Sequence, residues 1–369
     1  MGTDELYPPD RLVAAQRATA AAGLDALLLT PGCDLRYLTG YDAHAGERLT
    51  CLVLPAEGEP TLVVPRLERP AAEASVGTGL RIVDHADGAD PYPLVVAALD
   101  GPAAAVGLAD RMWAEQVLAL RAALPGAAQH LAGEVLRELR IRKSPAEVAA
   151  LAEAGAAIDE VHLRMGEWLR PGRTEAEVAT DIAAAIRAAR HVSVDFVIVA
   201  AGPNGASPHH GTSDRPIGVG EPVVVDIGGT MPTGYRSDCT RTYLAGGPAP
   251  ADFVEYYAVL HAAQRAAVAA VRPGITAAAA DAAARAPITA AGYGDAFVHR
   301  TGHGIGLDGH EEPYLVAGND RPLEAGMAFS IEPGIYLAGR HGARIEDIVV
   351  CTTDGVQRLN TTPTELIAL

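Results

Sequence analysis

The chain has 369 residues, of which 49% are apolar, and its formal net charge is −17. This length is typical of two domains with large buried cores, and the acidity argues against nucleic-acid binding, which needs a basic surface. No apolar run reaches the roughly 20 residues of a membrane-spanning helix, and the acidic, polar start of the sequence is unlike a signal peptide. The four cysteines lack CxxC spacing, which predicts reduced thiols in a cytoplasmic protein without a zinc knuckle.

The first 126 residues alternate predicted strands and helices. A helix is predicted over 10–22, and another over 112–124, where Pro125 and Gly126 end it. Short apolar runs bounded by turn residues predict five strands, over 25–30, 51–55, 61–65, 81–85 and 103–108. The second and third of these flank AEGE and should form a hairpin. Residues 1–126 are therefore predicted to form a small α/β domain.

A different order of predicted helices and strands begins after residue 133 and occurs a second time further along the chain. Ser144 to Glu147 is a capping box that opens a helix to about Leu169, and a second box, Thr174 to Glu177, follows the segment RPGRT. Three strands come next, over 194–200, 222–229 and 237–245. About a hundred residues later the order returns, with helices on either side of RPGIT and strands at 327–334 and 343–350. Residues 133–369 are thus predicted to be an α+β domain with a pseudo-twofold internal duplication around one shared sheet.

Four carboxylates lie at matching places in the two copies. Asp226 and Glu332 each end an apolar strand, and Asp238 and Glu346 lie on the strands that follow them. Buried carboxylates are costly unless they are paired, hydrogen-bonded or bound to metal, and four of them around one axis would repel each other. Bound cations are the natural solution.

A histidine in a glycine-rich segment completes the candidate metal site. His303 lies in HRTGHGIGLDGHEEP, whose glycines permit close approach of the backbone. Four carboxylates and one imidazole favour Mn²⁺ over the thiolate-seeking Zn²⁺, and bridging carboxylates would hold two ions about 3–4 Å apart. Taken singly, each residue has a structural interpretation: Asp226 as a turn residue, Glu346 paired with Arg344 or Arg241, and His303 as an ordinary loop histidine. The symmetrical combination favours metal binding.

Because of these candidate ligands and the motifs around them, the second domain resembles the pita-bread metallopeptidases. This family includes methionine aminopeptidase, aminopeptidase P, Xaa-Pro dipeptidase (prolidase) and creatinase. The matching motifs are VVVDIGG, SDCTRT, HGIG, IEPG and RIED, in order along 133–369. The segment GLDALLLTPGCDLRYLTGY makes the first domain similar to the creatinase-type N-terminal domain, which methionine aminopeptidase lacks.

The resemblance implies roles for individual residues. The implied metal ligands are Asp226, Asp238, His303, Glu332 and Glu346, with Asp238 and Glu346 bridging two ions. Glu332, His310 and His209 are implied catalytic residues. His299, Arg344 and His210 are implied to bind substrate. His210 follows His209 in the sequence and would take its role if the alignment with the family motif shifts by one residue. Arg344 is the first choice for binding a substrate carboxylate, and Arg48 of the first domain is the second.

The resemblance also implies eleven residues between the two aspartates. We count one more than this in the present chain, and we place it in the turn TMPTGY. We expect the hairpin to absorb it, because a shift of the strand by one residue would turn Asp238 to the opposite face.

The implied function is that of a dinuclear-metal hydrolase that cleaves the Xaa-Pro amide bond of dipeptides. Its implied cofactors are two divalent ions, Mn²⁺ before Co²⁺ or Zn²⁺, and its implied partners are a small peptide and a second copy of the chain. The short first domain favours a Xaa-Pro dipeptidase over aminopeptidase P. Three alternatives stay open: aminopeptidase P activity on longer peptides, hydrolysis of small amino-acid derivatives, and a non-catalytic binding module.

Overall fold

The computed structural model of the protein describes residues 6–75 and 80–369. The chain divides into two compact units, Met1–Arg140 and Ile141–Leu369. Within the described ranges no helix combines the length and the hydropathy that a membrane crossing requires. Cys51, Cys239 and Cys351 are buried free thiols.

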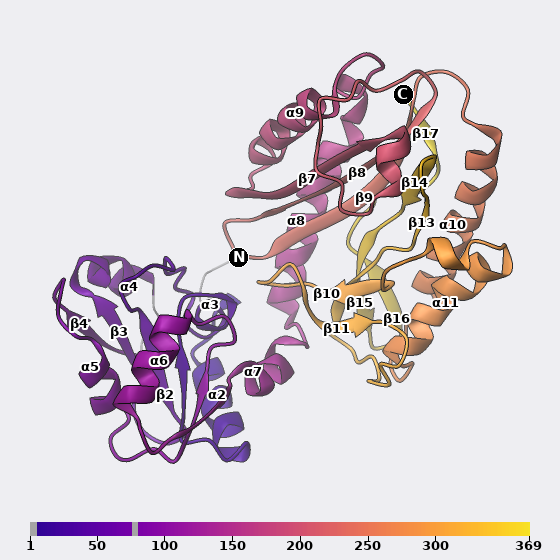
Figure 1. The fold of residues 1–369 in the computed structure, drawn as a ribbon. Helices are drawn as coiled ribbons and strands as arrows, with labels where there is room; N and C mark the ends of the chain where they lie inside the picture. The colour runs from indigo at the N-terminus through magenta and orange to yellow at the C-terminus, as the bar shows by residue number, and fades with distance from the viewer. Residues whose placement is uncertain (1–5, 76–79) are drawn as a thin grey trace. The chain divides into compact units, whose positions relative to one another are not determined.

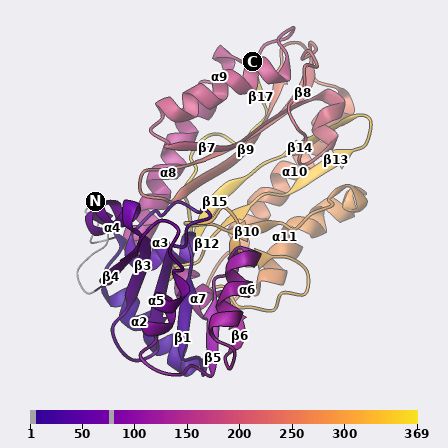
Figure 2. The ribbon, with the colours of Figure 1, turned by 60° about the vertical axis from the view of Figure 1, so that its left-hand side comes forward.

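The first unit is a mixed sheet covered by helices on both faces (Figures 1 and 2). The strand order is β4-β3-β2-β1-β5-β6, with β1–β2 and β2–β3 antiparallel and the other neighbours parallel. The strands are β1 (Ala26–Leu29), β2 (Cys51–Pro55), β3 (Thr61–Pro65), β4 (Arg81–His85), β5 (Ala105–Leu108) and β6 (Ala128–Leu131). The helices are α2 (Asp10–Ala21), α3 (Cys33–Thr39), α4 (Arg69–Ser75), α5 (Tyr92–Ala97), α6 (Ala114–Ala123) and α7 (Gly133–Arg140). The hairpin expected around AEGE is the β2–β3 pair.

This unit ends later than the sequence suggests. β6 adds a sixth strand after residue 126, and α7 packs against α2 and α3. The compact unit therefore extends to Arg140. The predicted boundaries at 126 and 133 miss these two elements, because AQHL has no apolar alternation and α7 follows it almost at once.

The second unit packs two helix pairs against separate groups of strands (Figure 1). The helices are α8 (Pro145–Leu163), α9 (Glu175–Ala188), α10 (Ala251–Ala270) and α11 (Ala277–Ala290). One sheet has the order β17-β9-β8-β7, a second β11-β10-β12-β15-β16, and a third pairs β13 with β14. The strands are β7 (Ser193–Ala201), β8 (Glu221–Thr230), β9 (Arg236–Ala245), β10 (Gly302–Gly304), β11 (Glu311–Leu315), β12 (Ala328–Ile331), β13 (Gly334–Leu337), β14 (His341–Arg344), β15 (Asp347–Thr352), β16 (Gly355–Arg358) and β17 (Ile367–Ala368).

The duplication is visible in the backbone as well as in the element order. Both capping boxes form as predicted, at Ser144 and Thr174. The two RPGxT segments make the same contacts in each copy: Gly172 with Ile217 and Thr174 with Pro216 in the first, Gly274 with Leu323 and Thr276 with Pro322 in the second. Identical contacts in both copies support a repeated unit rather than a chance similarity of two turns.

The expectation of one shared sheet is wrong. In the second unit, the ladders of the described residues form three sheets, because the chain leaves its strands at Glu332 and Pro333 and again at Ile345 and Glu346. Proline has no N–H to continue a ladder. The predicted strands 327–334 and 343–350 are each two short strands, and a candidate metal ligand lies in each break.

Candidate metal centre

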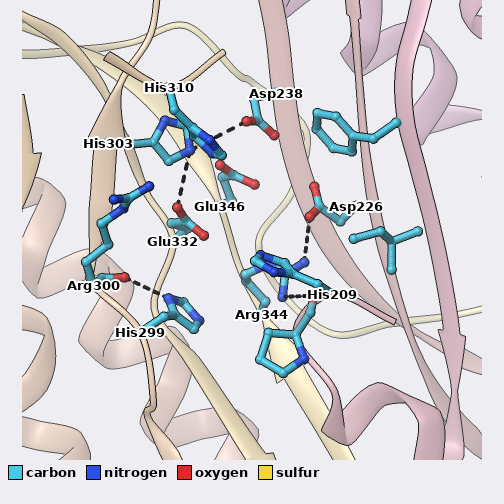
Figure 3. Close-up of a pocket in the computed structure, with 13 residues that line it drawn as sticks. His209, Asp226, Asp238, His299, Arg300, His303, His310, Glu332, Arg344 and Glu346 are labelled. Carbon is cyan, nitrogen blue, oxygen red and sulfur yellow. Dashed lines mark hydrogen bonds and ion pairs between the residues drawn. The ribbon is translucent and has the colours of Figure 1, made fainter. Parts of the chain in front are cut away.

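A cavity of about 480 Å³ lies between the two copies of the duplicated unit (Figure 3). Its walls come from β7, β8 and β9 of the first copy and from residues 299–346 of the second. The lining residues are Phe196, Ile198, Pro208, His209, Asp226, Asp238, His299, Arg300, His303, His310, Glu332, Arg344 and Glu346. All five candidate metal ligands are therefore brought together.

The β8–β9 hairpin places both aspartates on one face. Asp226 lies opposite Thr240, and Asp238 lies opposite Gly228, so these side chains point to the same side of the sheet. Eleven residues, 227–237, separate the aspartates, and the register runs without a bulge. The extra residue that we expected in this turn does not exist.

The second copy contributes its carboxylates from breaks between strands. Glu332 follows β12, where its N–H donates to the Thr301 carbonyl (2.8 Å). Glu346 lies between β14 and β15, and its N–H donates to the Thr240 carbonyl of β9 (3.1 Å). These bonds orient two side chains that no sheet ladder holds.

His303 on β10 presents one ring nitrogen to the carboxylates. Its Nδ1 lies 3.1 Å from the Gly304 carbonyl, which can only accept, so Nδ1 carries the proton. Nε2 then faces Glu332 Oε1 at 3.4 Å and Asp238 Oδ2 at 3.7 Å. Burial, followed by the neighbouring His310, lowers the pKa of His303 to about 3, which keeps the ring neutral. A neutral imidazole with its second nitrogen hydrogen-bonded to a carbonyl is the usual form of a metal-binding histidine.

The glycines beside His303 are required by close backbone contacts. A Cβ at Gly302 would overlap the Ser330 carbonyl, and one at Gly304 would overlap the Glu312 carbonyl. The expectation that these glycines allow close approach is confirmed at these two positions.

The carboxylates repel one another strongly. Burial, together with the charges of Glu346, Asp226 and Glu332, raises the pKa of Asp238 well above its usual range. Burial raises the pKa of Glu332 to about 7 although Arg344 opposes the rise. Burial and then Glu332 and Asp226 raise the pKa of Glu346 well above its usual range.

This donor set fits bound cations. Oδ1 of Asp226 is buried and has no hydrogen-bond partner within the described chain. Single ligand atoms of Asp238, His303 and Glu346 lie within 4.8 Å of one another. An orphaned buried oxygen beside three further carboxylates is costly unless a cation is present. The residues therefore have the chemistry of a cation site.

The four candidate histidines differ in their surroundings. His310 lines the cavity with its ring against that of His303, at 4.0 Å between centroids. His209 also lines the cavity. His299 lies at the wall, but both ring nitrogens are occupied, by the Arg300 carbonyl (2.7 Å) and by the Tyr336 hydroxyl (2.8 Å). Its geometry suits the support of a neighbour better than direct contact with substrate.

His210 is directed away from this centre. It does not belong to the residues that line the cavity, and its Nε2 lies 2.8 Å from Oε2 of the buried Glu175. Glu175 also accepts from the Ala201 N–H, from Asn204 and from Ser213. His210 thus helps to hold the loop that carries His209, which is a correction to its expected contact with substrate.

The arginines also differ from expectation. Arg344 is buried and already engaged: Nη2 lies 2.6 Å from Asp226 Oδ2, Nη1 donates to the Tyr336 hydroxyl and Nε to Thr240. It is therefore poorly placed to hold a substrate carboxylate. Arg48 pairs with Glu47 and Asp87 within the first unit.

Arg300 is the functional candidate that sequence reasoning missed. It lines the cavity, and its guanidinium lies 4.4 Å from the centroid of the Tyr314 ring. In the described part of the chain, no carboxylate pairs with it. Its position three residues before His303 was the available signal, but sequence alone could not tell which arginine is already paired.

Comparison with known proteins agrees with this architecture. Residues 149–353, more than half of the chain, match the model of metallopeptidase family M24, and residues 11–142 match the creatinase/prolidase N-terminal domain. The probable dipeptidase PepE of Mycobacterium tuberculosis is 56% identical over 361 residues, 97% of this chain and 96% of the relative. The Xaa-Pro dipeptidase of Lactobacillus delbrueckii subsp. lactis is 37% identical over 360 residues, 94% and 95% of the two chains. The crystal structure of dipeptidase PepE from Mycobacterium ulcerans matches with a TM-score of 0.92 and 58% identity, and covers 100% of this chain and 99% of that one.

The fold and the matches define the class of this protein as a metallopeptidase with a creatinase-type N-terminal domain. The chain belongs to metallopeptidase family M24. The fold class predicted from the sequence is therefore confirmed, including the α/β first domain and the duplicated second domain.

Proposed function

We propose that the protein is a two-metal Xaa-Pro dipeptidase, which hydrolyses the amide bond of a dipeptide whose second residue is proline. The observation that carries this proposal is the convergence of three buried carboxylates, the partly buried Glu332 and His303 on one cavity, with an unpartnered oxygen on Asp226 among the described residues. The printed names of the relatives, dipeptidase and Xaa-Pro dipeptidase, support the substrate class.

The proposed metal ligands are Asp226, Asp238, His303, Glu332 and Glu346. The oxygen-rich donor set favours Mn²⁺, with Co²⁺ and Zn²⁺ as alternatives. When bound, two such ions would acidify a water molecule and polarise the scissile carbonyl.

The side chains around the centre supply the remaining chemistry. Glu332 lies at the cavity wall beside His303, where it can accept a proton from the attacking water and return it to the leaving nitrogen. His310 and His209 line the same cavity and can donate hydrogen bonds to the oxygen that becomes negative. His299 holds the Tyr336 hydroxyl, which in turn holds Arg344 against Asp226.

The cavity also offers contacts for the ring and for the carboxylate of the substrate proline. Phe196 and Ile198 share the face of the sheet that carries Asp226, so they form an apolar wall for the pyrrolidine ring. Gly228 leaves room for that wall, because a Cβ there would come within 2.6 Å of the Phe196 ring. Arg300 replaces Arg344 as our candidate for binding the substrate carboxylate, because its guanidinium has no acidic partner within residues 6–75 and 80–369.

The direct test is hydrolysis of Gly-Pro and Ala-Pro by metal-stripped protein, with and without added Mn²⁺. We expect Mn²⁺-dependent cleavage of both dipeptides and much slower cleavage of Ala-Pro-Ala. Faster cleavage of the tripeptide would favour aminopeptidase activity instead. Two bound ions without cleavage of either peptide would indicate another amide substrate, and absence of metal binding would favour a binding module.

Replacing Arg300 with alanine is expected to raise KM for Ala-Pro about tenfold or more, the cost of losing one charged hydrogen-bonding partner. Because the contact is made to the carboxylate, KM for Ala-Pro amide should change little. Arg142→Ala is a suitable control, since Arg142 is exposed and pairs with Glu324. An equal effect on the acid and on the amide would contradict the assignment of Arg300.

The proposal includes a homodimer and a cytoplasmic location. The buried free thiols of Cys51, Cys239 and Cys351 support a reducing compartment. Light scattering during size-exclusion chromatography measures the oligomeric state, and a monomer mass would remove the dimer from the proposal.

A further inference from the structure

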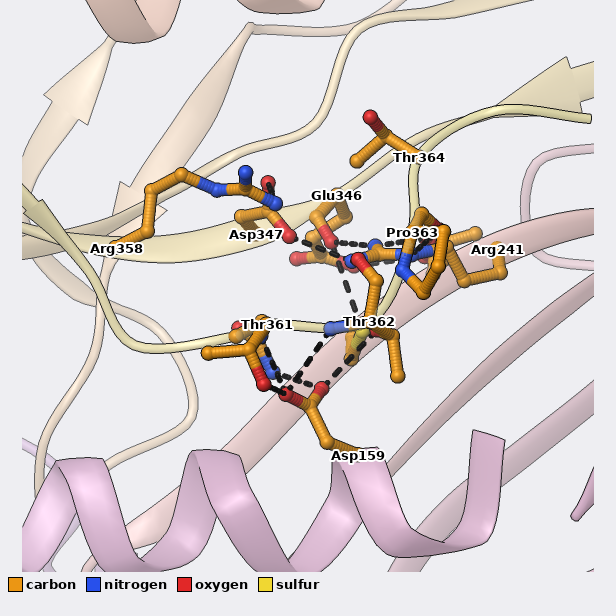
Figure 4. Close-up of polar contacts among 12 residues, drawn as sticks. Asp159, Arg241, Glu346, Asp347, Arg358, Thr361, Thr362, Pro363 and Thr364 are labelled. Atoms are coloured by element: carbon orange, nitrogen blue, oxygen red, sulfur yellow. Dashed lines mark hydrogen bonds and ion pairs between the residues drawn. The ribbon is translucent and has the colours of Figure 1, made fainter. Parts of the chain in front are cut away.

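The backbone of Glu346 depends on hydrogen-bond donors that no sheet ladder supplies. Glu346 is 2% exposed and lies in the break between β14 and β15. A buried backbone carbonyl outside a ladder requires another donor. The donors are Arg241 on β9, whose Nη1 lies 2.5 Å from the Glu346 carbonyl oxygen (Figure 4), and the Cys239 thiol of the same strand, at 3.6 Å.

Arg241 is itself held rigidly. It is 2% exposed and all five of its N–H groups have acceptors. Besides Glu346, the acceptors are the carbonyls of Thr240, Thr362 and Pro363 and the carboxylate of Asp347 (2.7 Å). Asp347 is completely buried and is held on its other oxygen by Gln264 and Arg358. A lysine has only three donors on a flexible stem and cannot reproduce this arrangement.

Strand β9 therefore contributes to the candidate metal centre through side chains on both of its faces. On the cavity face, Asp238 is a candidate ligand, and the Thr240 hydroxyl donates to Glu346 Oε2 at 2.7 Å. On the opposite face, Arg241 binds the Glu346 carbonyl. The N–H of Glu346 also donates to β9, at the Thr240 carbonyl. One strand thus carries one proposed metal ligand, Asp238, and holds a second, Glu346, at its N–H, its carbonyl and its carboxylate.

We propose that Arg241, with Asp347, is a positioning residue for the metal centre: it fixes the Glu346 backbone so that its carboxylate faces the candidate ligand Asp238. The inference rests on the proposed two-metal function. Partners of this kind behind a ligand typically contribute about 10–100-fold to metal affinity.

The test is metal titration of metal-stripped full-length protein with Co²⁺, followed by its absorption spectrum and by equilibrium dialysis. For Arg241→Lys, we expect the Kd of at least one Co²⁺ ion to rise about 10–100-fold, with a changed visible spectrum. A second variant, Arg241→Met with Asp347→Asn, removes both members of the pair and leaves no lone charge between them. Circular dichroism shows which variants keep the native fold.

Asp159→Asn is the matched control. From helix α8, Asp159 binds Thr361 and Thr362, so it anchors the same C-terminal segment that Arg241 contacts, but it does not touch Glu346. This variant should lose thermal stability and keep the wild-type Kd for Co²⁺. Equal metal affinity in the wild type and in a folded Arg241 variant would overturn the inference, as would an equal loss in Asp159→Asn. A wild type that binds no Co²⁺ would instead refute the metal centre itself.

Discussion

Replacing Glu332 with glutamine is expected to lower kcat for Ala-Pro hydrolysis by at least about a hundredfold, the usual contribution of a positioned acid or base. Glu332 is the candidate ligand nearest to His303 Nε2, and it also accepts from the Ser330 hydroxyl (3.3 Å). A glutamine keeps an oxygen for the metal but cannot take up a proton. The loss should therefore appear in kcat more than in KM.

Kinetics and metal content measured on the same sample separate the two roles of Glu332. At saturating Mn²⁺ the variant should retain its metal and still be slow. Glu324→Gln is the control, because Glu324 is a half-exposed carboxylate of the same unit that pairs with Arg142. Wild-type kcat in a fully loaded Glu332→Gln protein would refute the proton-transfer role.

Removal of the metal is expected to destabilise the protein increasingly as the pH rises. The unfolded carboxyl groups lose their protons near pH 4, whereas the pKa of Glu332 is about 7 in the folded chain and those of Asp238 and Glu346 are raised as well. Between these limits the folded protein binds more protons than the unfolded one, so stability is lost as the pH rises through this window. Relative to the metal-loaded protein, Tm without metal should fall by at least about 5 °C from about pH 5 to about pH 8.

Differential scanning calorimetry with and without Mn²⁺ measures this difference. Asp238→Asn removes one of the buried charges, so the metal-free variant should show a flatter dependence on pH. If metal-free and metal-loaded wild type lose stability in parallel, the carboxylates are not the source of the destabilisation.

Local patterns in the sequence predicted much of the fold. Ser144 and Thr174 open helices because a side-chain oxygen three residues before a glutamate caps the helix whatever surrounds it. Asp226 and Asp238 were expected to converge, and they lie on one face because side chains alternate along paired strands. Both signals depend on nearest neighbours along the chain or across one hairpin.

Contacts between distant segments decided the rest. The pairing of Arg344 with Asp226 spans 118 residues and leaves Arg300 as the cavity-lining arginine without an acidic partner among the described residues. The pairing of His210 with Glu175 spans 35 residues and separates its role from that of His209. No local pattern distinguishes these neighbours, since either arginine and either histidine has the required chemistry.

The sequence by itself predicted the two-domain organisation, the duplication and the set of residues that we propose as metal ligands, because periodicity, caps and carboxylate spacing are properties of short segments. Only the tertiary structure decided the breaks at Glu332 and Glu346, the division of the strands into three sheets and the support of Glu346 by Arg241. Those features depend on which buried donors and acceptors meet across the folded chain, and a buried polar group finds its partner wherever the packing places one.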